Sequence, residues 1–196
     1  MHAAATMAEP RELPLFAWSQ ALRRDRARRR RLCVRATLVA AGIGALAATI
    51  ALPPAPRLVW NASASAPIGL YRVAPGAPVS TGDMVVAWLP AKARALAASR
   101  RYLPAEVPAV KRVAAGPGAR VCAIGDTIRI DGRVSATRLR TDRLGRPLPW
   151  WRGCHVLGPD ERFLLMANSA ASFDGRYFGV SRTADIVGKA TLLWPR

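Results

Sequence analysis

The chain has 196 residues, is 51% hydrophobic by composition and carries a formal net charge of +18. Such a length suits one ordinary domain with a packed core, and the charge is typical of proteins that bind nucleic acid or an anionic membrane, or of an arginine-rich proteome. The sequence contains no zinc-ligand spacing, RNA-binding sheet motif or helix-turn-helix pattern, so we expect no nucleic acid among its partners.

The first 35 residues form a strongly basic segment. Residues 1–35 contain nine arginines against Glu9, Glu12 and Asp25, and the densest run reads LRRDRARRRRLCVR. Basic residues that flank a membrane segment stay on its cytoplasmic side. We therefore predict that residues 1–35 are a basic cytoplasmic tail.

An uncharged apolar segment, ATLVAAGIGALAATIAL, follows over residues 36–52 and ends before Pro53 and Pro54. A run of about 17 residues is at the short end of what spans a bilayer as a helix. We predict one transmembrane helix that anchors the chain in the lipid of the inner membrane, with residues 53–196 in the periplasm. A cleaved signal peptide is the first alternative. A buried core helix is the second, but it should be amphipathic and should not follow an arginine cluster.

The pattern after Pro54 favours short strands separated by turns, because prolines and glycines interrupt it throughout. The strand candidates are MVVAWL (84–89), VKRVAA (110–115), two strands within RVCAIGDTIRIDGRV (120–134), and RFLLMAN (162–168). Asp131-Gly132 is typical of a hairpin turn. One short helix is expected outside the membrane, around Ala91–Arg101. The predicted fold is mainly β, with coiled sheets or a partly open barrel.

Two cysteines, Cys122 and Cys154, lie in the part of the chain that we expect to be exported, whereas Cys33 lies at the membrane edge. In an oxidising compartment Cys122 and Cys154 would be able to pair. Two buried free thiols are the alternative. The sequence leaves both open.

Histidine and metal chemistry are poorly represented in this chain. Its two histidines are His2, in the tail, and His155, in GCHVLG, where we expect a structural or exposed side chain. A Ser-His-Asp triad is therefore nearly excluded. Neither an HExxH motif nor a cluster of metal-ligating residues occurs, so we expect no metal and no cofactor.

A serine activated by a lysine remains as the plausible nucleophile. A neutral amine can accept the serine proton if burial lowers its pKa towards the working pH. Lys111 is the candidate because Val110 and Val113 flank it on a probable buried strand, whereas Lys92 and Lys189 have more polar surroundings. A strand lysine that points to solvent is the alternative for Lys111.

Four motifs occur in order: NASASAPIGLYRV, GDMVVAWLP, VKRVAAGPGARV and SFDGRYFGV. Together they resemble the serine-lysine signal peptidases, the S26 superfamily, and within it the conjugative transfer peptidases of the TraF type. The resemblance covers about residues 57–194. It implies the mainly β signal-peptidase fold and a peptidase that uses a Ser-Lys dyad.

The resemblance assigns the nucleophile to Ser65 and the general base to Lys111. Ser63 matches the serine that helps to bind the oxyanion in leader peptidases, where the N–H of the nucleophile is the other donor. We expect Pro67 and Gly69 to shape a strand that holds both serines.

The SFDGRYFG block implies supporting roles for Ser172, Asp174 and Arg176. By resemblance, Ser172 orients Lys111, and a salt bridge joins the other two. The physics agrees, since a hydroxyl positions the amine without charging it, whereas an unshielded carboxylate beside it would favour the ammonium. Asp174 should therefore pair with Arg176 and not with Lys111.

The expected function is that of a membrane-anchored serine endopeptidase. By resemblance, its substrate is an exported precursor, the pilin of a conjugative type IV secretion system, and other components of that system are possible partners. Relatives are also linked to pilin cyclisation, and the sequence leaves hydrolysis and cyclisation open. The rivals are a general signal peptidase I and a non-catalytic anchored component of the transfer apparatus. A basic DNA-binding protein and a repressor-type autoprotease fit the predicted export and membrane helix poorly.

Overall fold

The computed structural model describes residues 14–52 and 55–196. His2 and the start of the predicted tail therefore lie outside the described residues, as do Pro53 and Pro54. The chain divides into two compact units, with the boundary between Pro54 and Ala55. Each unit is considered by itself.

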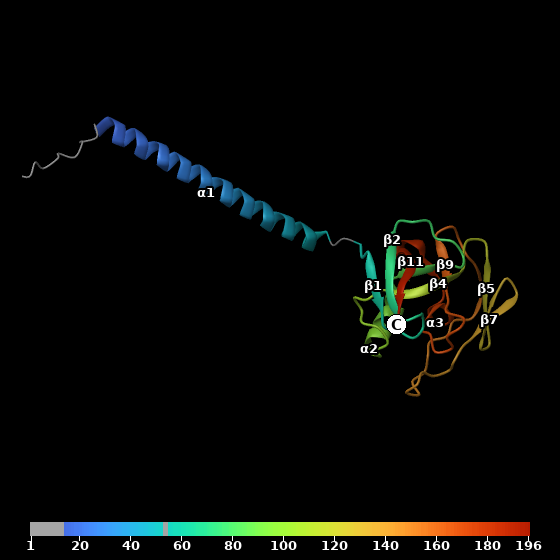
Figure 1. The fold of residues 1–196 in the computed structure, drawn as a ribbon. Helices are drawn as coiled ribbons and strands as arrows, with labels where there is room; N and C mark the ends of the chain where they lie inside the picture. The colour runs from blue at the N-terminus through green and yellow to red at the C-terminus, as the bar shows by residue number, and fades with distance from the viewer. Residues whose placement is uncertain (1–13, 53–54) are drawn as a thin grey trace, which may run out of the picture. The chain divides into compact units, whose positions relative to one another are not determined.

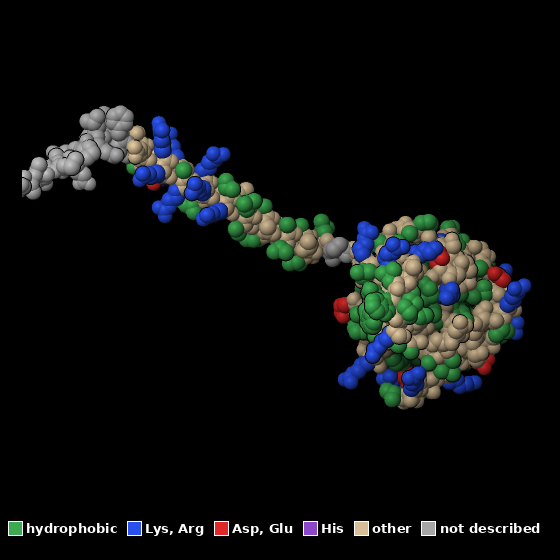
Figure 2. All heavy atoms as spheres, in the orientation of Figure 1, with side chains coloured by type: hydrophobic (Ala, Val, Ile, Leu, Met, Phe, Trp, Pro, Cys, Tyr) green, Lys and Arg blue, Asp and Glu red, His purple; other side chains and the backbone are tan. Residues whose placement is uncertain are grey.

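The first unit is one long helix, α1, Pro14–Ala51. Figure 2 shows basic side chains gathered along its first half and hydrophobic ones along its second half. The helix runs through the predicted boundary at residue 35, because arginine is a good helix former and extending an existing helix costs little. The part of the helix from Trp18 to Ala51 contains an 18-residue window that is apolar enough to cross a membrane, and none of that window is buried. The alternative of a buried core helix therefore gains no support. The retained membrane anchor stays a prediction, with a cleaved signal peptide as its alternative.

The second unit is built around a seven-stranded antiparallel sheet (Figure 1). Its strand order is β1-β2-β11-β3-β4-β9-β10. The bounds are β1 Leu58–Asn61, β2 Gly69–Pro75, β11 Ile186–Pro195, β3 Met84–Ala87, β4 Ala109–Ala115, β9 Glu161–Leu164 and β10 Ser181–Arg182. Within the described residues the edge strands β1 and β10 do not pair with each other, so the sheet stays open.

A separate four-stranded sheet has the order β7-β6-β5-β8. Its strands are β7 Arg133–Thr137, β6 Thr127–Ile130, β5 Arg120–Ile124 and β8 Gly153–Val156. Figure 1 shows β5 and β7 on the side of the domain away from β1 and β2. The predicted mainly β class is thus confirmed.

All five strands predicted from apolar runs are present, as β3, β4, β5, β6 and β9. The hairpin turn is also present, since Asp131 and Gly132 have φ of 48° and 80° and join β6 to β7. Such left-handed pairs match the twist of a two-residue hairpin. Strands β1, β2, β8, β10 and β11 lie outside the predicted segments, because their sequences are short, alternate weakly or carry glycine or proline.

The predicted short helix is α2, Ala91–Ser99. The expectation that it would be the only helix of the body is wrong. A four-residue helix, α3, Gly175–Phe178, and a 3-10 turn, Thr183–Asp185, are also present. The side chain of Asp174 caps α3 by accepting a hydrogen bond from the N–H of Arg176. One helical turn held by its cap has too few residues to show a helical period.

The cysteine pair is resolved in favour of the disulfide. Cys122 on β5 lies directly opposite Cys154 on β8, and the two are bonded to each other. Cys33 on α1 is a free, exposed thiol. The disulfide joins two strands of the smaller sheet.

The inner strand β11 approaches β2 so closely that only glycine fits at position 188. A Cβ on Gly188 would lie 2.4 Å from the carbonyl oxygen of Ala74, a backbone atom that cannot move aside. Gly188→Ala should therefore lower the free energy of unfolding by about 2 kcal/mol. Gly116→Ala is the matched control, because its Cβ would meet nothing closer than 3.5 Å. Urea denaturation of the purified variants measures both, and equal stabilities would contradict the packing described.

Candidate active site

Ser63 and Ser65 lie in the turn that connects β1 to β2, residues 62–68. The expectation that a strand holds both serines is therefore wrong. The chain turns here, with the N–H of Ala66 donating to the carbonyl of Ser63 at 3.4 Å, and Pro67 has no N–H to continue a ladder. A turn leaves both hydroxyls accessible from solvent.

The side chain of Asn61, the last residue of β1, fixes the backbone of this turn. Its buried side-chain Nδ2 donates to the carbonyls of Ser63 at 2.9 Å, Ala66 at 3.2 Å and Pro67 at 3.0 Å. Its Oδ1 accepts from the N–H of Ser63 at 3.1 Å. The hydroxyl of Tyr71 adds a 2.8 Å bond to the carbonyl of Pro67. Sequence reasoning missed Asn61, although an asparagine two residues before a small polar residue is typical of such turns.

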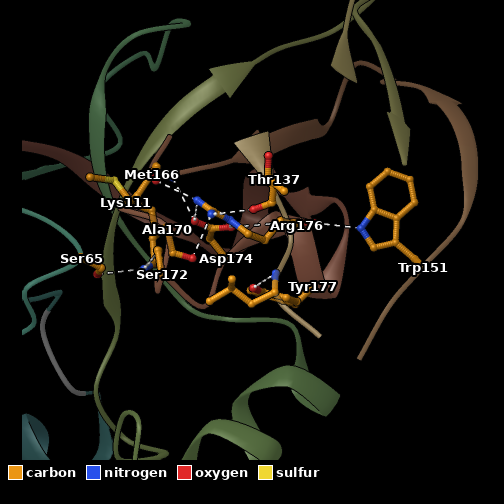
Figure 3. Close-up of polar contacts among 12 residues, drawn as sticks. Ser65, Lys111, Thr137, Trp151, Met166, Ala170, Ser172, Asp174, Arg176 and Tyr177 are labelled. Carbon is orange, nitrogen blue, oxygen red and sulfur yellow. Dashed lines mark hydrogen bonds and ion pairs between the residues drawn. The ribbon is translucent and has the colours of Figure 1, made fainter. Parts of the chain in front are cut away.

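Lys111 lies in the middle of β4, opposite Val85 of β3, and only 4% of it is exposed. The alternative of a solvent-facing lysine is therefore wrong. Its Nζ donates to Ser65 Oγ at 3.1 Å and to Ser172 Oγ at 3.0 Å. Figure 3 shows the amine between these two hydroxyls. The structure thus joins three of the predicted site residues.

Burial sets the protonation of this lysine. Desolvation of the ammonium lowers the pKa of Lys111 from 10.5 to about 8, against the opposing field of Asp174 and with the help of that of Arg176. The two hydrogen-bond partners of this lysine are hydroxyls and neither is a carboxylate. Its pKa therefore stays close to the pH range in which a neutral amine can act as a base.

Ser63 completes the hydroxyl chain. Its Oγ lies 3.0 Å from Ser65 Oγ, and the N–H of Ser65 points to the same Ser63 oxygen at 3.4 Å. The Ser63 hydroxyl and the Ser65 N–H, the two predicted oxyanion donors, are thus side by side. Both hydrogen bonds join only Ser63 and Ser65. The hydroxyl and the N–H could therefore donate to the oxygen of a bound ligand instead.

Asp174 and Arg176 form a fully buried ion pair, as predicted. Arg176 Nε donates to Asp174 Oδ1 at 2.8 Å and Nη2 donates to Oδ2 at 3.1 Å. The N–H of Met166 also donates to Asp174 Oδ2, at 3.0 Å, and Arg176 Nη2 donates to the Met166 carbonyl at 2.8 Å. Figure 3 shows the pair beyond Ser172, on the side away from Ser65. The carboxylate is therefore committed to arginine.

The other candidate bases lie elsewhere. Lys92 is exposed on α2, and Lys189 forms an ion pair with Asp83 at 2.8 Å. His155 is exposed on β8, where its Nε2 lies 2.7 Å from a carboxylate oxygen of Glu161. Among the described residues no group of three or more His, Cys, Asp or Glu side chains is placed to hold a metal ion.

A groove of about 800 Å³ runs past the Ser65 and Ser172 hydroxyls and the Lys111 amine. Ser65, Lys111 and Ser172 line it together with a largely apolar surface. The apolar contribution comes from several elements, including Val59, Leu103, Val107, Val110 and Phe173. The groove is large enough for several residues of an extended peptide.

Removing the buried carboxylate tests the ion pair. Asp174→Asn leaves the Arg176 guanidinium buried without a counter-charge, so the free energy of unfolding should fall by about 3 kcal/mol. Asp83→Asn, which breaks the exposed pair with Lys189, is the matched control and should change little. Thermal and urea unfolding measure both variants. Equal losses would show that burial of the Asp174–Arg176 pair has no special weight.

Comparison with known proteins relates this chain to a family. The sequence profile of the family described as signal peptidase, peptidase S26, matches residues 30–194. The plasmid transfer protein TraF of Escherichia coli is 33% identical over 129 residues, which are 61% of this chain and 72% of that protein. The conjugal transfer protein TraF of Agrobacterium tumefaciens (strain 15955) is 40% identical over 129 residues, with the same coverage of 61% and 72%.

Among solved structures, a signal peptidase I from Enterococcus faecalis V583 is similar with a TM-score of 0.35 and 20% sequence identity. The match covers 59% of this chain and 98% of that one. The family assignment itself comes from the sequence matches, since the profile covers well over half of the chain. The chain belongs to the signal peptidase family, peptidase S26.

Proposed function

We propose that this chain is a membrane-anchored serine endopeptidase in which Ser65 is the nucleophile and Lys111 is the general base. One observation carries the proposal: the buried Lys111 amine lies 3.1 Å from Ser65 Oγ. Burial also lowers the pKa of Lys111 to about 8. A neutral amine within hydrogen-bond reach of a hydroxyl is what a general base requires. Membership of a peptidase family supports the same reading.

Acylation begins with proton transfer. Neutral Lys111 takes the proton from Ser65 Oγ as that oxygen attacks the scissile carbonyl carbon, and the carbonyl oxygen becomes an oxyanion. The Ser63 hydroxyl and the Ser65 N–H turn from each other to this oxygen, a stabilisation commonly worth a few kcal/mol per donor. The ammonium of Lys111 then gives its proton to the leaving amine, and the C–N bond breaks. Ser172, 3.0 Å from Nζ, keeps the amine in position throughout.

Deacylation uses the same base. Lys111, neutral again, takes a proton from the incoming nucleophile as that nucleophile attacks the ester carbon, and it returns the proton to Ser65 Oγ as the ester breaks. Water as the nucleophile yields a free carboxylate. The amino terminus of the same precursor yields a cyclic amide instead. The dyad serves either outcome, and access to the ester decides between them.

The substrate that we propose is an exported precursor, the pilin of a conjugative type IV secretion system. Support comes from relatives named plasmid transfer and conjugal transfer proteins. We place residues 1–35 in the cytoplasm, 36–52 in the inner membrane and 53–196 in the periplasm. The arginine-rich start of α1 and the disulfide between Cys122 and Cys154 support this orientation. Other transfer components are the proposed partners.

Removing either member of the dyad should abolish processing. Ser65→Ala and Lys111→Ala, each co-expressed with the pilin precursor, should lower the processing rate at least about a thousandfold, because nucleophile and base act as one unit. Ser135→Ala and Lys92→Ala remove the same chemical groups away from the groove and should process normally. Mass spectrometry of the pilin measures the outcome, and a product lighter by one water than the linear form identifies cyclisation.

Normal processing by both dyad variants would overturn the assignment and favour the non-catalytic component. Cleavage of many unrelated preproteins by the wild type would favour the general signal peptidase I. Circular dichroism and membrane localisation of each variant exclude misfolding as the cause of any loss.

The pH dependence tests the role of Lys111. Only the neutral amine accepts the serine proton, and with a pKa of about 8 its fraction falls about tenfold for each pH unit below that value. The kcat/KM for a peptide without ionisable groups should therefore rise as pH increases and level off above about pH 8. Initial rates across the pH range measure this profile. A flat profile, or one that falls as pH rises, is incompatible with a lysine base of this pKa.

A further inference from the structure

The groove beside the dyad is lined by three arginines that the reaction does not use. Arg100, Arg143 and Arg146 line it, and Asp142 is the one acidic residue in its lining. Arg100 follows α2, and the others belong to the loop after β7. The local balance of arginine and aspartate therefore leaves two positive charges in excess.

Asp142 is already saturated by the protein. Its Oδ1 accepts from the N–H groups of Leu144 and Arg146, each at 2.9 Å, and its Oδ2 accepts from Arg146 Nε at 2.7 Å and from the hydroxyl of Tyr102. Although burial would raise the pKa of Asp142, the hydrogen bonds from Tyr102, Arg146 and Leu144 lower it well below its usual range. This carboxylate anchors the loop, and its Oδ2 also lies 4.0 Å from Arg100 Nη1, so its single negative charge is shared between Arg100 and Arg146 and does not offset the charge of all three arginines.

Two of the three arginines are held in place before any ligand arrives. Arg100 Nη1 donates to the carbonyl of Pro147 at 2.8 Å, and the Arg146 guanidinium lies 5.5 Å from the centre of the Tyr102 ring. Arg143 is exposed and makes no ion pair within the part of the chain that the structure describes. Positioned guanidinium groups bind planar anions with little loss of side-chain entropy.

The surroundings strengthen an interaction with an anion. The same groove is otherwise largely apolar, with Leu103, Val107 and Phe173 in its lining. A ligand that fills the groove displaces water from these surfaces, and charge pairs gain strength when water is excluded. The only common anion of an unmodified polypeptide near neutral pH is the carboxylate.

We propose that these arginines form a carboxylate subsite, which holds a carboxylate of the precursor while its scissile bond lies at Ser65. The carboxylate comes either from an acidic side chain near the cleavage site or from the C-terminus of the precursor. The proposal rests on the proposed function, since it names a feature of the substrate of that site. It makes the arginine cluster a determinant of which precursors are processed.

Peptide binding tests the subsite without requiring cleavage. The probes are octapeptides of alanine, glycine and serine that carry an uncharged fluorophore at the N-terminus. One set is amidated and carries a single Glu at each position in turn, with Gln at the same position as its neutral match. A second set has no Glu and ends in either a free carboxylate or an amide. Fluorescence anisotropy with full-length Ser65→Ala in detergent gives the Kd values.

We expect one Glu position, or the free C-terminus, to bind at least about tenfold more tightly than its neutral match. Arg143→Gln and Arg146→Gln, each added to Ser65→Ala, should reduce that ratio to near one. Arg146→Lys should restore it only in part, because an ammonium lacks the two-pronged geometry. Arg133→Gln removes an exposed arginine outside the groove and should leave the ratio unchanged. Arg143 makes none of the loop's anchoring contacts, so its variant tests the subsite even if Arg146→Gln disturbs the loop.

Equal Kd values for acidic and neutral peptides would overturn the subsite, as would an equal loss in Arg133→Gln, which would indicate only the overall positive charge. These outcomes differ from failure of the proposed function. In that case the carboxylate preference persists in Ser65→Ala, while the wild type leaves the pilin precursor uncleaved.

Discussion

The site depends on lowering the pKa of one lysine in the interior of a strongly basic protein. Lys111 achieves this because β4 buries it and because both groups within hydrogen-bond distance of its amine are hydroxyls. A carboxylate at the same distance would hold the proton on the amine. The field of the Asp174 carboxylate, which raises the pKa of Lys111, is instead balanced by the guanidinium of Arg176. The buried ion pair therefore leaves the amine without a carboxylate partner.

Lys111 and Ser65 are held by different kinds of structure. Lys111 lies on β4, an inner strand of the seven-stranded sheet that pairs with β3 and β9. Ser65 lies on a turn, where no ladder of hydrogen bonds fixes the backbone. Asn61 supplies the missing rigidity by bonding to the backbone of the turn at several points. A turn with a clamp gives an accessible hydroxyl together with a defined position, which a strand interior would not allow.

The groove combines two kinds of surface, which in the proposed function would contact different parts of a precursor. Its apolar lining favours small or apolar side chains, which give little selectivity because they differ from one another by only a few methyl groups. The arginine cluster would add the proposed contact with a carboxylate, and a charged contact discriminates more strongly because an unmatched partner leaves desolvated charge behind. A peptidase with few substrates gains more from such a contact than one that acts on many preproteins.

The sequence by itself determined the apolar segment, the mainly β class, the hairpin at Asp131-Gly132 and the choice of Lys111, because each is visible in local pattern or in the apolar neighbours of one residue. It did not determine the turn that carries Ser65, the role of Asn61 or the arginine cluster. These depend on contacts between distant positions: the partners of Lys111 lie 46 and 61 residues away along the chain. Only the tertiary structure decides such contacts, since the pKa of an amine and the environment of a carboxylate depend on which segments cover them in space.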